Sequence, residues 1–386
     1  MFRAALLFSC LVLLRLPNAG AQATSASGSN QNAASLPLSI PFDFFSNQIM
    51  IKVTVNGSEP VWFILDSGAS GCVVDTALAQ KLGIKTEGEK QGTGAGKGTV
   101  RVLFAQHVTY GLPGLSLRVD ESYVIDLSSQ PALLGRYVGG VLGYSFFAPY
   151  VVDVDYDARI LTLYDPESYE PVGRKVPFTL FKHTPHIRVR LVVGGHRAVE
   201  REVLVDSGSQ GAVDDELLAQ SRERLEVIGG VGLGQEFRTV LGRADTLSLD
   251  SFTLPRPFGA TGGTGLIGNE VLRRFHVAFD YAHARIFLSP GQHFSDPFLF
   301  DASGLDLRCV SEGAAFVIHD VAKASAAWEA GLRAEDTVIA INGQPASAFT
   351  IDQLAALFSQ DGRVLWLTVK KDADTRSIRL TLRKRL

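Results

Sequence analysis

The chain has 386 residues, of which 46% are hydrophobic and 20% are charged, and its formal net charge at pH 7 is -3. This length predicts two or three globular domains, and the 38 glycines are typical of a turn-rich protein. The nearly neutral charge balance lacks the basic footprint of a nucleic-acid-binding protein, so no nucleic-acid partner is expected.

An export signal is predicted for residues 1–23. An arginine near the start precedes an apolar run over residues 4–14, and small residues then offer cleavage after Ala21 or Ala23. The run is shorter than the roughly 20 apolar residues of a membrane span, so a retained anchor and a lipoprotein site at Cys10 are weaker alternatives. We therefore expect export to the periplasm, cell envelope or extracellular space, with no membrane span after signal removal.

A flexible leader is predicted for residues 24–38, which are rich in small polar side chains. Beyond the signal the chain keeps two cysteines, Cys72 and Cys309, which are too few for a disulfide framework and fall in different predicted domains. Both are interpreted as small buried hydrophobic residues. The eight histidines form no His-Glu-x-x-His pair, so neither a metal site nor a cofactor is expected.

The next region repeats itself, once over residues 39–170 and again over residues 171–293. Strand-like sequence at 40–55 returns at 176–191, and in both copies apolar residues alternate with polar ones as they do in half-buried strands. The Asn-Gly pair at 56–57 predicts a hairpin turn. Each repeat is therefore predicted to form one β-rich lobe.

Each repeat carries an Asp-Ser-Gly motif directly after an apolar strand, beginning at Asp66 in the first repeat and at Asp206 in the second. A Gly-rich stretch, an apolar-apolar-Gly step and an Asp-Tyr pair follow in the same order in both repeats. A lone Asp-Ser-Gly motif is usually a turn in which Asp and Ser cap backbone groups. The ordered repetition favours a functional interpretation. The acidic pair at 214–215 is predicted to begin a helix.

On these motifs the chain resembles the retropepsin and pepsin superfamily of aspartic peptidases, specifically the bacterial retropepsin-like proteins with two lobes in one chain. The resemblance covers about residues 40–290 and implies a mainly β fold in which two tandem lobes form one pepsin-like cleft. It also implies that Asp66 and Asp206 are the catalytic pair. Two adjacent carboxylates share one proton, so one can activate water while the other hydrogen-bonds the scissile carbonyl, without a metal.

The resemblance implies supporting roles around this pair. Ser67 and Ser207 would cross-brace the two loops through their hydroxyl groups, and Gly68 and Gly208 would permit close backbone approach where the lobes meet. The Gly-rich stretches would be flaps that contact substrate. Their candidate residues are Gly92, Thr93, Gly94, Gly230 and Gly232.

A difference between the repeats predicts an asymmetric pair. Ser209 follows Asp206 by three residues, whereas Ala69 stands at this position in the first repeat. By the resemblance, the Ser209 hydroxyl would donate to the outer oxygen of Asp206 and favour its ionised form. Asp66 is then expected to hold the shared proton for more of the time.

A separate module is predicted for residues 300–386, which belong to neither repeat. Predicted strands at 305–310 and 316–321, followed by Ala-Gly-Leu and Ile-Asn-Gly steps, resemble a PDZ domain, an α+β fold, with residues 351–358 as the groove helix. In PDZ domains a peptide C-terminus adds beside the second strand, and the loop before that strand holds its carboxylate. The implied peptide-binding residues are Gly313, Ala314, Ala315 and Phe316.

The predicted function is that of an aspartic endopeptidase whose PDZ domain helps to recruit a peptide or protein substrate without taking part in bond breaking. A monomer is expected because one chain already contains both Asp-Ser-Gly loops. Two alternatives remain open. One is a catalytically silent protein that uses the cleft and the PDZ domain to hold peptides, and the other is an enzyme that acts on few substrates or only one.

Overall fold

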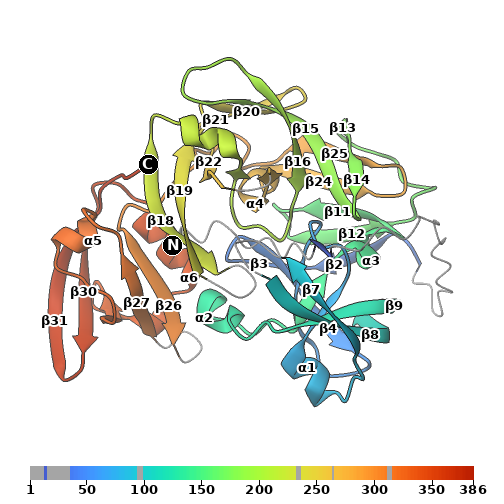
Figure 1. Ribbon diagram of the computed structural model, residues 1–386, viewed down its shortest axis with the longest axis horizontal. Helices are drawn as coiled ribbons and strands as arrows, with labels where there is room; N and C mark the ends of the chain where they lie inside the picture. Colours follow the sequence, from blue (N-terminus) through green and yellow to red (C-terminus); the bar gives the residue numbers. More distant parts are fainter. Residues whose placement is uncertain (1–12, 15–34, 94–98, 232–235, 263–264, 311–314) are drawn as a thin grey trace.

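The computed structural model describes residues 13–14, 35–93, 99–231, 236–262, 265–310 and 315–386 (Figure 1). These residues form a mainly β protein, which confirms the predicted fold class. In Figure 1 the second repeat lies above the first, and the C-terminal module lies at the left beside both. None of the helices within the described residues is long and apolar enough to cross a membrane.

The first lobe is built on a nine-stranded sheet. Its strands are β1 (Leu13–Leu14), β3 (Asp43–Phe45), β4 (Gln48–Val55), β5 (Val61–Leu65), β6 (Val73–Asp75), β7 (Glu87–Thr93), β8 (Thr99–Leu112), β9 (Leu115–Ile125) and β10 (Gly140–Leu142). They lie in the order β1-β7-β8-β9-β6-β10-β5-β4-β3, and β8 also pairs with β4. The helices of this lobe are α1 (Thr76–Lys81), α2 (Gln130–Leu134) and α3 (Tyr144–Phe147).

The second lobe divides its strands between two sheets. The larger sheet contains β14 (Thr179–Phe181), β15 (Thr184–Val192), β16 (Val199–Val205), β17 (Val213–Asp214), β20 (Thr246–Leu249), β21 (Phe252–Pro255) and β23 (Leu266–Ile267). Its order is β17-β23-β16-β15-β20-β21, with β14 beside β15. The smaller sheet has the order β18 (Arg224–Val231), β19 (Glu236–Arg243), β22 (Phe258–Ala260). A 3-10 helix, η1 (Glu216–Gln220), and α4 (Asn269–Leu272) complete this lobe.

A six-stranded sheet joins the lobes. Its strands are β2 (Leu38–Pro41), β11 (Val151–Asp155), β12 (Ile160–Tyr164), β13 (Arg174–Pro177), β24 (Phe275–Asp280) and β25 (Arg285–Pro290). In the order β13-β25-β24-β11-β12-β2, three strands of the second repeat meet three strands of the first at the central β24–β11 pair. Because strands from both repeats share one ladder and one hydrophobic core, the lobes are held as one body.

The local elements follow the sequence pattern closely. Along β4, Ile51, Val53 and Val55 are buried whereas Lys52 is exposed, as the alternation of apolar and polar residues predicts. The turn at 56–57 joins β4 to β5 with positive φ at both residues, which is the hairpin geometry that an Asn-Gly pair favours. The predicted hairpin is therefore confirmed.

The C-terminal module has its own core and its own sheet. The sheet is formed by β26 (Leu305–Val310), β27 (Ala315–Val321), β28 (Thr337–Ile341), β29 (Gln344–Pro345), β30 (Val364–Lys371) and β31 (Asp374–Thr381). The order is β26-β27-β28-β30-β31, with β29 beside β28. The helices are α5 (Ala326–Glu329), the 3-10 helix η3 (Ala346–Ala348) and α6 (Ile351–Phe358).

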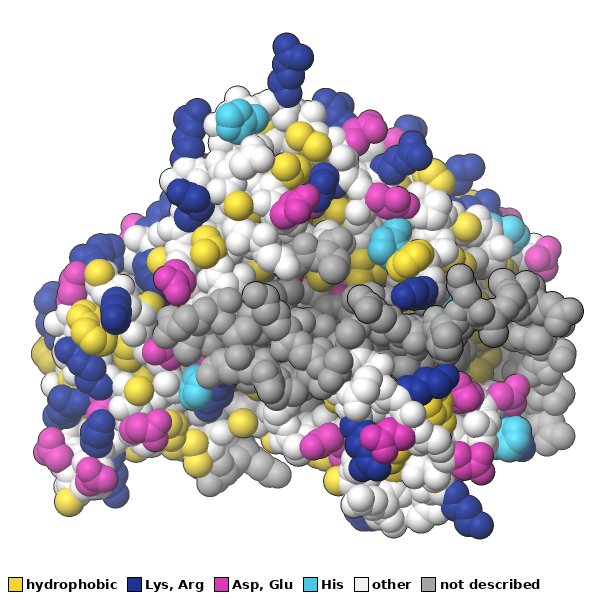
Figure 2. All heavy atoms as spheres, viewed as in Figure 1, with side chains coloured by type: hydrophobic (Ala, Val, Ile, Leu, Met, Phe, Trp, Pro, Cys, Tyr) yellow, Lys and Arg dark blue, Asp and Glu magenta, His cyan; other side chains and the backbone are white. Residues whose placement is uncertain are grey.

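The boundaries of α6 match the predicted groove helix because Thr350 and Gln353 form a capping box at its start. The module is also tied to the lobes, since Phe298, Phe300 and Leu386 are buried in the core that the lobes share. On the face drawn in Figure 2, the described Lys and Arg side chains are interspersed with Asp and Glu.

Candidate active site

The two Asp-Ser-Gly loops occupy equivalent places in their lobes. Asp66 follows β5, and its N–H donates to Leu142 O of β10, which lies between β5 and β6 (3.0 Å). Asp206 follows β16, and its N–H donates to Ile267 O of β23, which lies between β16 and β17 (2.9 Å). The apolar-apolar-Gly step of each repeat thus supports the loop of its own lobe.

Ser67 and Ser207 join the two loops through reciprocal hydrogen bonds. The Ser67 N–H donates to Ser207 Oγ (2.9 Å), and the Ser207 N–H donates to Ser67 Oγ (3.0 Å). Each hydroxyl also donates across the lobe boundary, from Ser67 to Val205 O (2.7 Å) and from Ser207 to Leu65 O (2.9 Å). Both serines are completely buried, so the bonds are shielded from water and fix one loop against the other.

Each motif glycine packs against the aspartate of the opposite lobe. A Cβ added to Gly68 would lie 2.7 Å from Asp206 Cγ, and one added to Gly208 would lie 2.3 Å from Asp66 Cγ. Carbon atoms do not approach this closely without displacement, so any larger side chain would push the loops apart. Neither glycine has a positive φ, so backbone conformation does not require glycine at these positions. Glycine is required because the two lobes approach closely there.

Replacing Gly208 with alanine should lower kcat/KM for peptide cleavage by at least about 100-fold, because a misplacement of about 1 Å has that effect on catalysis. The measurement is steady-state cleavage of a fluorogenic peptide at equal concentrations of folded protein. Gly262→Ala is the matched control, since a Cβ there has no neighbour within 4 Å. Equal activity of both variants would show that the close approach at Gly208 is not needed.

The two carboxyl groups lie in contact at the lobe boundary and are completely buried. The pKa of Asp66 is raised well above its ordinary value, first by burial and then by the charge of Asp206 and a hydrogen bond with that residue. Gly68 N–H donates to Asp66 Oδ1 (2.8 Å). Asp206 Oδ1 accepts from the N–H groups of Gly208 (2.9 Å) and Ser209 (3.1 Å). The pair can therefore hold one proton at a pH where an isolated carboxyl would be ionised.

The contact of Ser209 with Asp206 is made by its backbone, whereas the resemblance implied a contact from its hydroxyl. The Ser209 Oγ instead accepts a long hydrogen bond from Gly211 N–H (3.4 Å). Ala69 holds the position of Ser209 in the first repeat, and its backbone N–H likewise contacts Asp66. Burial is the leading cause of the raised pKa of Asp66, and the expectation that Asp66 holds the shared proton for more of the time stays a prediction.

Three further residues support the loops and were not singled out from the sequence. Tyr281 Oη donates to Ser67 O (3.0 Å), so a tyrosine of the second repeat holds the loop of the first. On the other side Tyr156 Oη donates to Asn269 Oδ1 (2.8 Å), and Asn269 Nδ2 donates to Ser207 O (2.6 Å). The repeated Asp-Tyr pair was the signal that could have identified the two tyrosines.

Asp214 is a third buried carboxyl group in this region. It lies in β17 at the position that Val74 holds in the first repeat, and Ala260 N–H donates to its Oδ1 (2.8 Å). Burial raises the pKa of Asp214 to about 8, with smaller effects from the charges of Asp206 and Asp215. The predicted helix start is correct only for Asp215, which caps η1. The sequence offered one signal for a buried Asp214, because the equivalent position in the first repeat holds the apolar residue Val74.

The predicted flap residues belong to two hairpins. Gly92 and Thr93 end β7, which pairs antiparallel with β8, and Gly230 lies in β18, which pairs with β19. Gly94 and Gly232 lie outside the described residues. β1 pairs with β7 at these same two residues, Gly92 and Thr93. Among the described residues, no group of three or more His, Cys, Asp or Glu side chains could hold a metal ion.

The predicted peptide-binding residues of the C-terminal module need correction. Gly313 and Ala314 lie outside the described residues, and Ala315 and Phe316 begin β27. β27 is an inner strand, because Phe316 pairs with Cys309 of β26 and with Val338 of β28. A peptide cannot add beside a strand that is paired on both sides, so the prediction is wrong for Ala315 and Phe316. The outer strands are β26 and β31.

Comparison with protein families gives two matches. Residues 51–146 match the aspartyl protease family, and residues 317–371 match the PDZ domain. A search of curated proteins finds no significant match. The first match contains the Asp66 loop and the apolar-apolar-Gly step that supports it, and the second lobe repeats both features. The chain is therefore similar to the aspartyl proteases over residues 51–146 and to PDZ domains over residues 317–371.

Proposed function

We propose that the chain is an aspartic endopeptidase in which Asp66 and Asp206 share one proton. The ionised carboxylate takes a proton from the attacking water, while the protonated carboxyl hydrogen-bonds the oxygen of the scissile carbonyl. The raised pKa of Asp66 supports a proton held by the pair. Backbone N–H groups donate to both carboxyl groups, those of Gly68 and Ala69 to Asp66 and those of Gly208 and Ser209 to Asp206, and they favour an ionised member of the pair.

The observation that carries the proposal is the reciprocal hydrogen bonding of Ser67 and Ser207. These bonds hold two carboxyl groups from different repeats in contact, although each group would be more stable in water. A protein that only held peptides would gain nothing from burying this pair. Both loops come from one chain, which supports activity as a monomer.

We further propose that the PDZ domain binds a peptide or protein segment between β26 and α6. Ala302, in the loop before β26, donates its N–H to Phe358 O at the end of α6 (2.8 Å), so strand and helix lie together. The end of α2 in the first lobe contacts β26, where a Cβ added to Gly135 would lie 2.9 Å from Cys309 Sγ. A segment bound there would lie beside the peptidase lobes, which favours delivery of substrate.

Export is part of the proposal, with the mature protein in the periplasm, cell envelope or extracellular space. Removal of the predicted signal should leave Gln22 or Thr24 as the first residue. Amino-terminal sequencing of the protein recovered from its native cells measures this directly. Recovery of a chain that still begins at Met1 would contradict a cleaved signal.

The test of function is incubation of the purified protein with a mixed peptide library, followed by mass spectrometry of the products over pH 3 to 8. We expect internal cleavage that does not require added metal, with a specific activity that is constant on dilution across the micromolar range. Peptide binding without cleavage at any pH would favour the silent binding protein. A steep loss of activity on dilution would contradict the monomer.

A further inference from the structure

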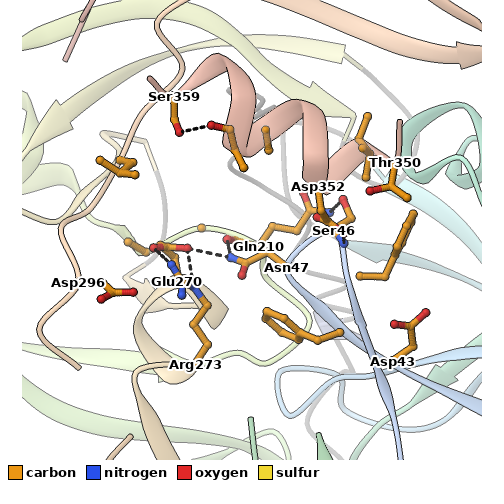
Figure 3. Close-up of a pocket in the computed structure, with 18 of the residues that line it drawn as sticks. Asp43, Ser46, Asn47, Gln210, Glu270, Arg273, Asp296, Thr350, Asp352 and Ser359 are labelled. Atoms are coloured by element: carbon orange, nitrogen blue, oxygen red, sulfur yellow. Dashed lines mark hydrogen bonds and ion pairs between the residues drawn. The ribbon is translucent and has the colours of Figure 1, made fainter. Parts of the chain in front are cut away.

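A two-residue turn connects the PDZ domain to the second lobe. Ser46 and Asn47 join β3 to β4, and both have positive φ (52° and 56°). On one side of the turn, Ser46 N–H donates to Asp352 Oδ2 in the first turn of α6 (2.9 Å; Figure 3). The preceding residue, Phe45, packs against the PDZ core and lies under the Arg136 guanidinium (4.1 Å). The turn is therefore anchored on the PDZ domain.

The other side of the turn holds the loop that carries Asp206. Gln48, whose side chain is buried, donates from Nε2 to Gly208 O (2.7 Å). Asn47 Nδ2 donates to Gln210 O (2.5 Å), and Gln210 lies two residues after Gly208 in the same loop. Since Gly208 N–H donates to Asp206 Oδ1, the peptide units on both sides of Gly208 are hydrogen-bonded. Movement of the turn would move the carboxylate.

Asn269 closes the network around this loop. Its Nδ2 donates both to Asn47 O (3.0 Å) and to Ser207 O (2.6 Å). Carbonyl groups of Ser207, Gly208 and Gln210 are thus all held by side-chain amides. The turn and this loop also share a wall of a cavity of about 850 Å³, whose opposite wall is α6 (Figure 3).

The repeat supplies an internal comparison. The equivalent turn of the second lobe, Lys182–His183, also has positive φ, and His183 stacks on Tyr144, the counterpart of Asn269 (4.1 Å between ring centroids). Phe181, which corresponds to Phe45, is 55% exposed there. Only one of two equivalent turns is therefore packed against the PDZ core, so the link to α6 is an addition to the repeated fold.

We propose that Asp352 and Gln48 are positioning residues of the aspartic peptidase site, through which the PDZ helix α6 holds the Asp206 loop. The proposal rests on the proposed function. It assigns the PDZ domain a role in turnover, in addition to any role in substrate capture. Neither residue contacts the reacting carboxyl groups directly, so both act through the Ser46–Asn47 turn and the carbonyl of Gly208.

Replacing Asp352 with alanine should lower kcat for a short peptide about tenfold and leave KM unchanged, because the dyad geometry loosens while the binding surface stays. Asp352→Asn keeps an acceptor for Ser46 N–H and should restore kcat to within about twofold of the wild type. The control is Glu329→Gln, which removes an exposed carboxylate of the same domain. Unchanged kcat in Asp352→Ala, or an equal loss in the control, would overturn the proposal.

A double-mutant cycle tests whether both residues act through one turn. Gln48→Ala, or Gln48→Met if alanine prevents folding, should lower kcat at least as much as Asp352→Ala. Because the second break adds nothing once the turn is released, the double variant should fall no further than Gln48→Ala alone. If the fold-losses in kcat of the two single variants multiply in the double variant, the two residues act independently and the proposed link is overturned.

Amide hydrogen exchange separates this proposal from the proposed function. In the full chain carrying Asp352→Ala, exchange should become faster in residues 203–212 and stay unchanged in residues 63–72 of the other loop. If the wild type cleaves no peptide but this difference is observed, the function is wrong and the link stands. If the wild type is active and both loops exchange as before, the link is wrong and the function stands.

Discussion

Asparagine in place of Asp66 or Asp206 should lower kcat/KM for peptide cleavage by about 10²–10⁴-fold, the usual contribution of general acid-base catalysis. The amide has nearly the same shape and can still accept the N–H of Gly68 or Gly208. It can neither hold the shared proton nor take one from water. The loss should therefore be in chemistry, measured as kcat at saturating peptide.

The two variants should be folded, and this can be checked by thermal unfolding at pH 7. The raised pKa of Asp66 means that ionising this carboxyl is costlier in the folded protein than in the unfolded chain. That cost grows as the pH rises above the ordinary carboxyl pKa. Removing one of the paired carboxyl groups removes the cost, so we expect melting temperatures equal to or above that of the wild type.

Asp214→Asn is the matched control because Asp214 is a buried carboxyl of the same lobe as Asp206. Its pKa of about 8 keeps it protonated and neutral at pH 7, so a neutral amide is a close substitute. The Oδ1 atom of asparagine can still accept Ala260 N–H. Activity should stay within about threefold of the wild type, since this residue is not expected to transfer a proton during catalysis. Full activity in Asp66→Asn would show that the pair is wrongly assigned.

The strands, the first hairpin and α6 could be predicted because each depends on local pattern. Alternation with a period of two specifies which face of β4 is buried, and the Asn-Gly pair accepts the positive φ that the turn requires. Thr350 and Gln353 mark the start of α6 through hydrogen bonds within four residues. Such features need no knowledge of distant parts of the chain.

The position of β27 could not be predicted from its own residues. Strand order depends on which segments meet across long sequence separations, and the strand pattern of Phe316 is the same whether its strand is an inner or an outer one. The placement of peptide-binding residues at Ala315 and Phe316 failed for this reason. Repetition succeeded where strand pattern failed, because two equivalent motifs predict a symmetric contact between Asp66 and Asp206.

The side chains around the loops were missed for a related reason. Gln48 and Asn269 differ in type from their counterparts in the other repeat, Thr184 and Tyr144, so repetition does not reveal them. Their roles depend on the few ångströms between lobes. The association of the PDZ domain with the lobes likewise depends on surfaces that no periodic pattern marks.

Replacing Arg243 with alanine should lower the free energy of unfolding by about 3–5 kcal/mol, the usual cost of removing one partner from a buried charged contact. Domains are typically stable by about 5–15 kcal/mol, so the loss would be large. Arg243 is 5% exposed. Burial, and then the charge of Arg256, lower the pKa of Arg243 to about 10, so the group is still charged at neutral pH.

The expected loss follows from three main-chain oxygen atoms that Arg243 holds together. Its Nη1 donates to Arg256 O (2.5 Å) and Phe298 O (3.3 Å), and its Nη2 donates to Leu386 O (2.9 Å). Arg256 belongs to the second lobe, Phe298 lies in the segment after that lobe, and Leu386 lies beyond the last strand of the PDZ sheet. Without the guanidinium the two buried acceptors, Phe298 O and Leu386 O, would lose this donor, each at a cost of about 1–3 kcal/mol.

The same contacts change the expected outcome of cutting the chain near Pro297. The sequence alone predicts that the protein without its PDZ domain still cleaves short peptides. Removal would also take Phe298, Phe300 and Leu386 out of the core that the lobes share. We now expect the shortened protein to be less stable than the full chain, so loss of activity there would not by itself assign the PDZ domain to catalysis.

The measurement is urea unfolding followed by circular dichroism and by tryptophan fluorescence, since two of the three tryptophans, Trp328 and Trp366, lie in the PDZ domain and the third, Trp62, lies in β5 of the first lobe. In the wild type the two curves should coincide, because shared contacts make the PDZ domain and lobes unfold together. Arg224→Ala is the matched control: Arg224 also donates to a backbone carbonyl, but it is exposed, so its loss should change stability by less than about 0.5 kcal/mol. If Arg243→Ala is as stable as this control, or if the wild-type curves separate, Arg243 does not join the PDZ domain to the second lobe.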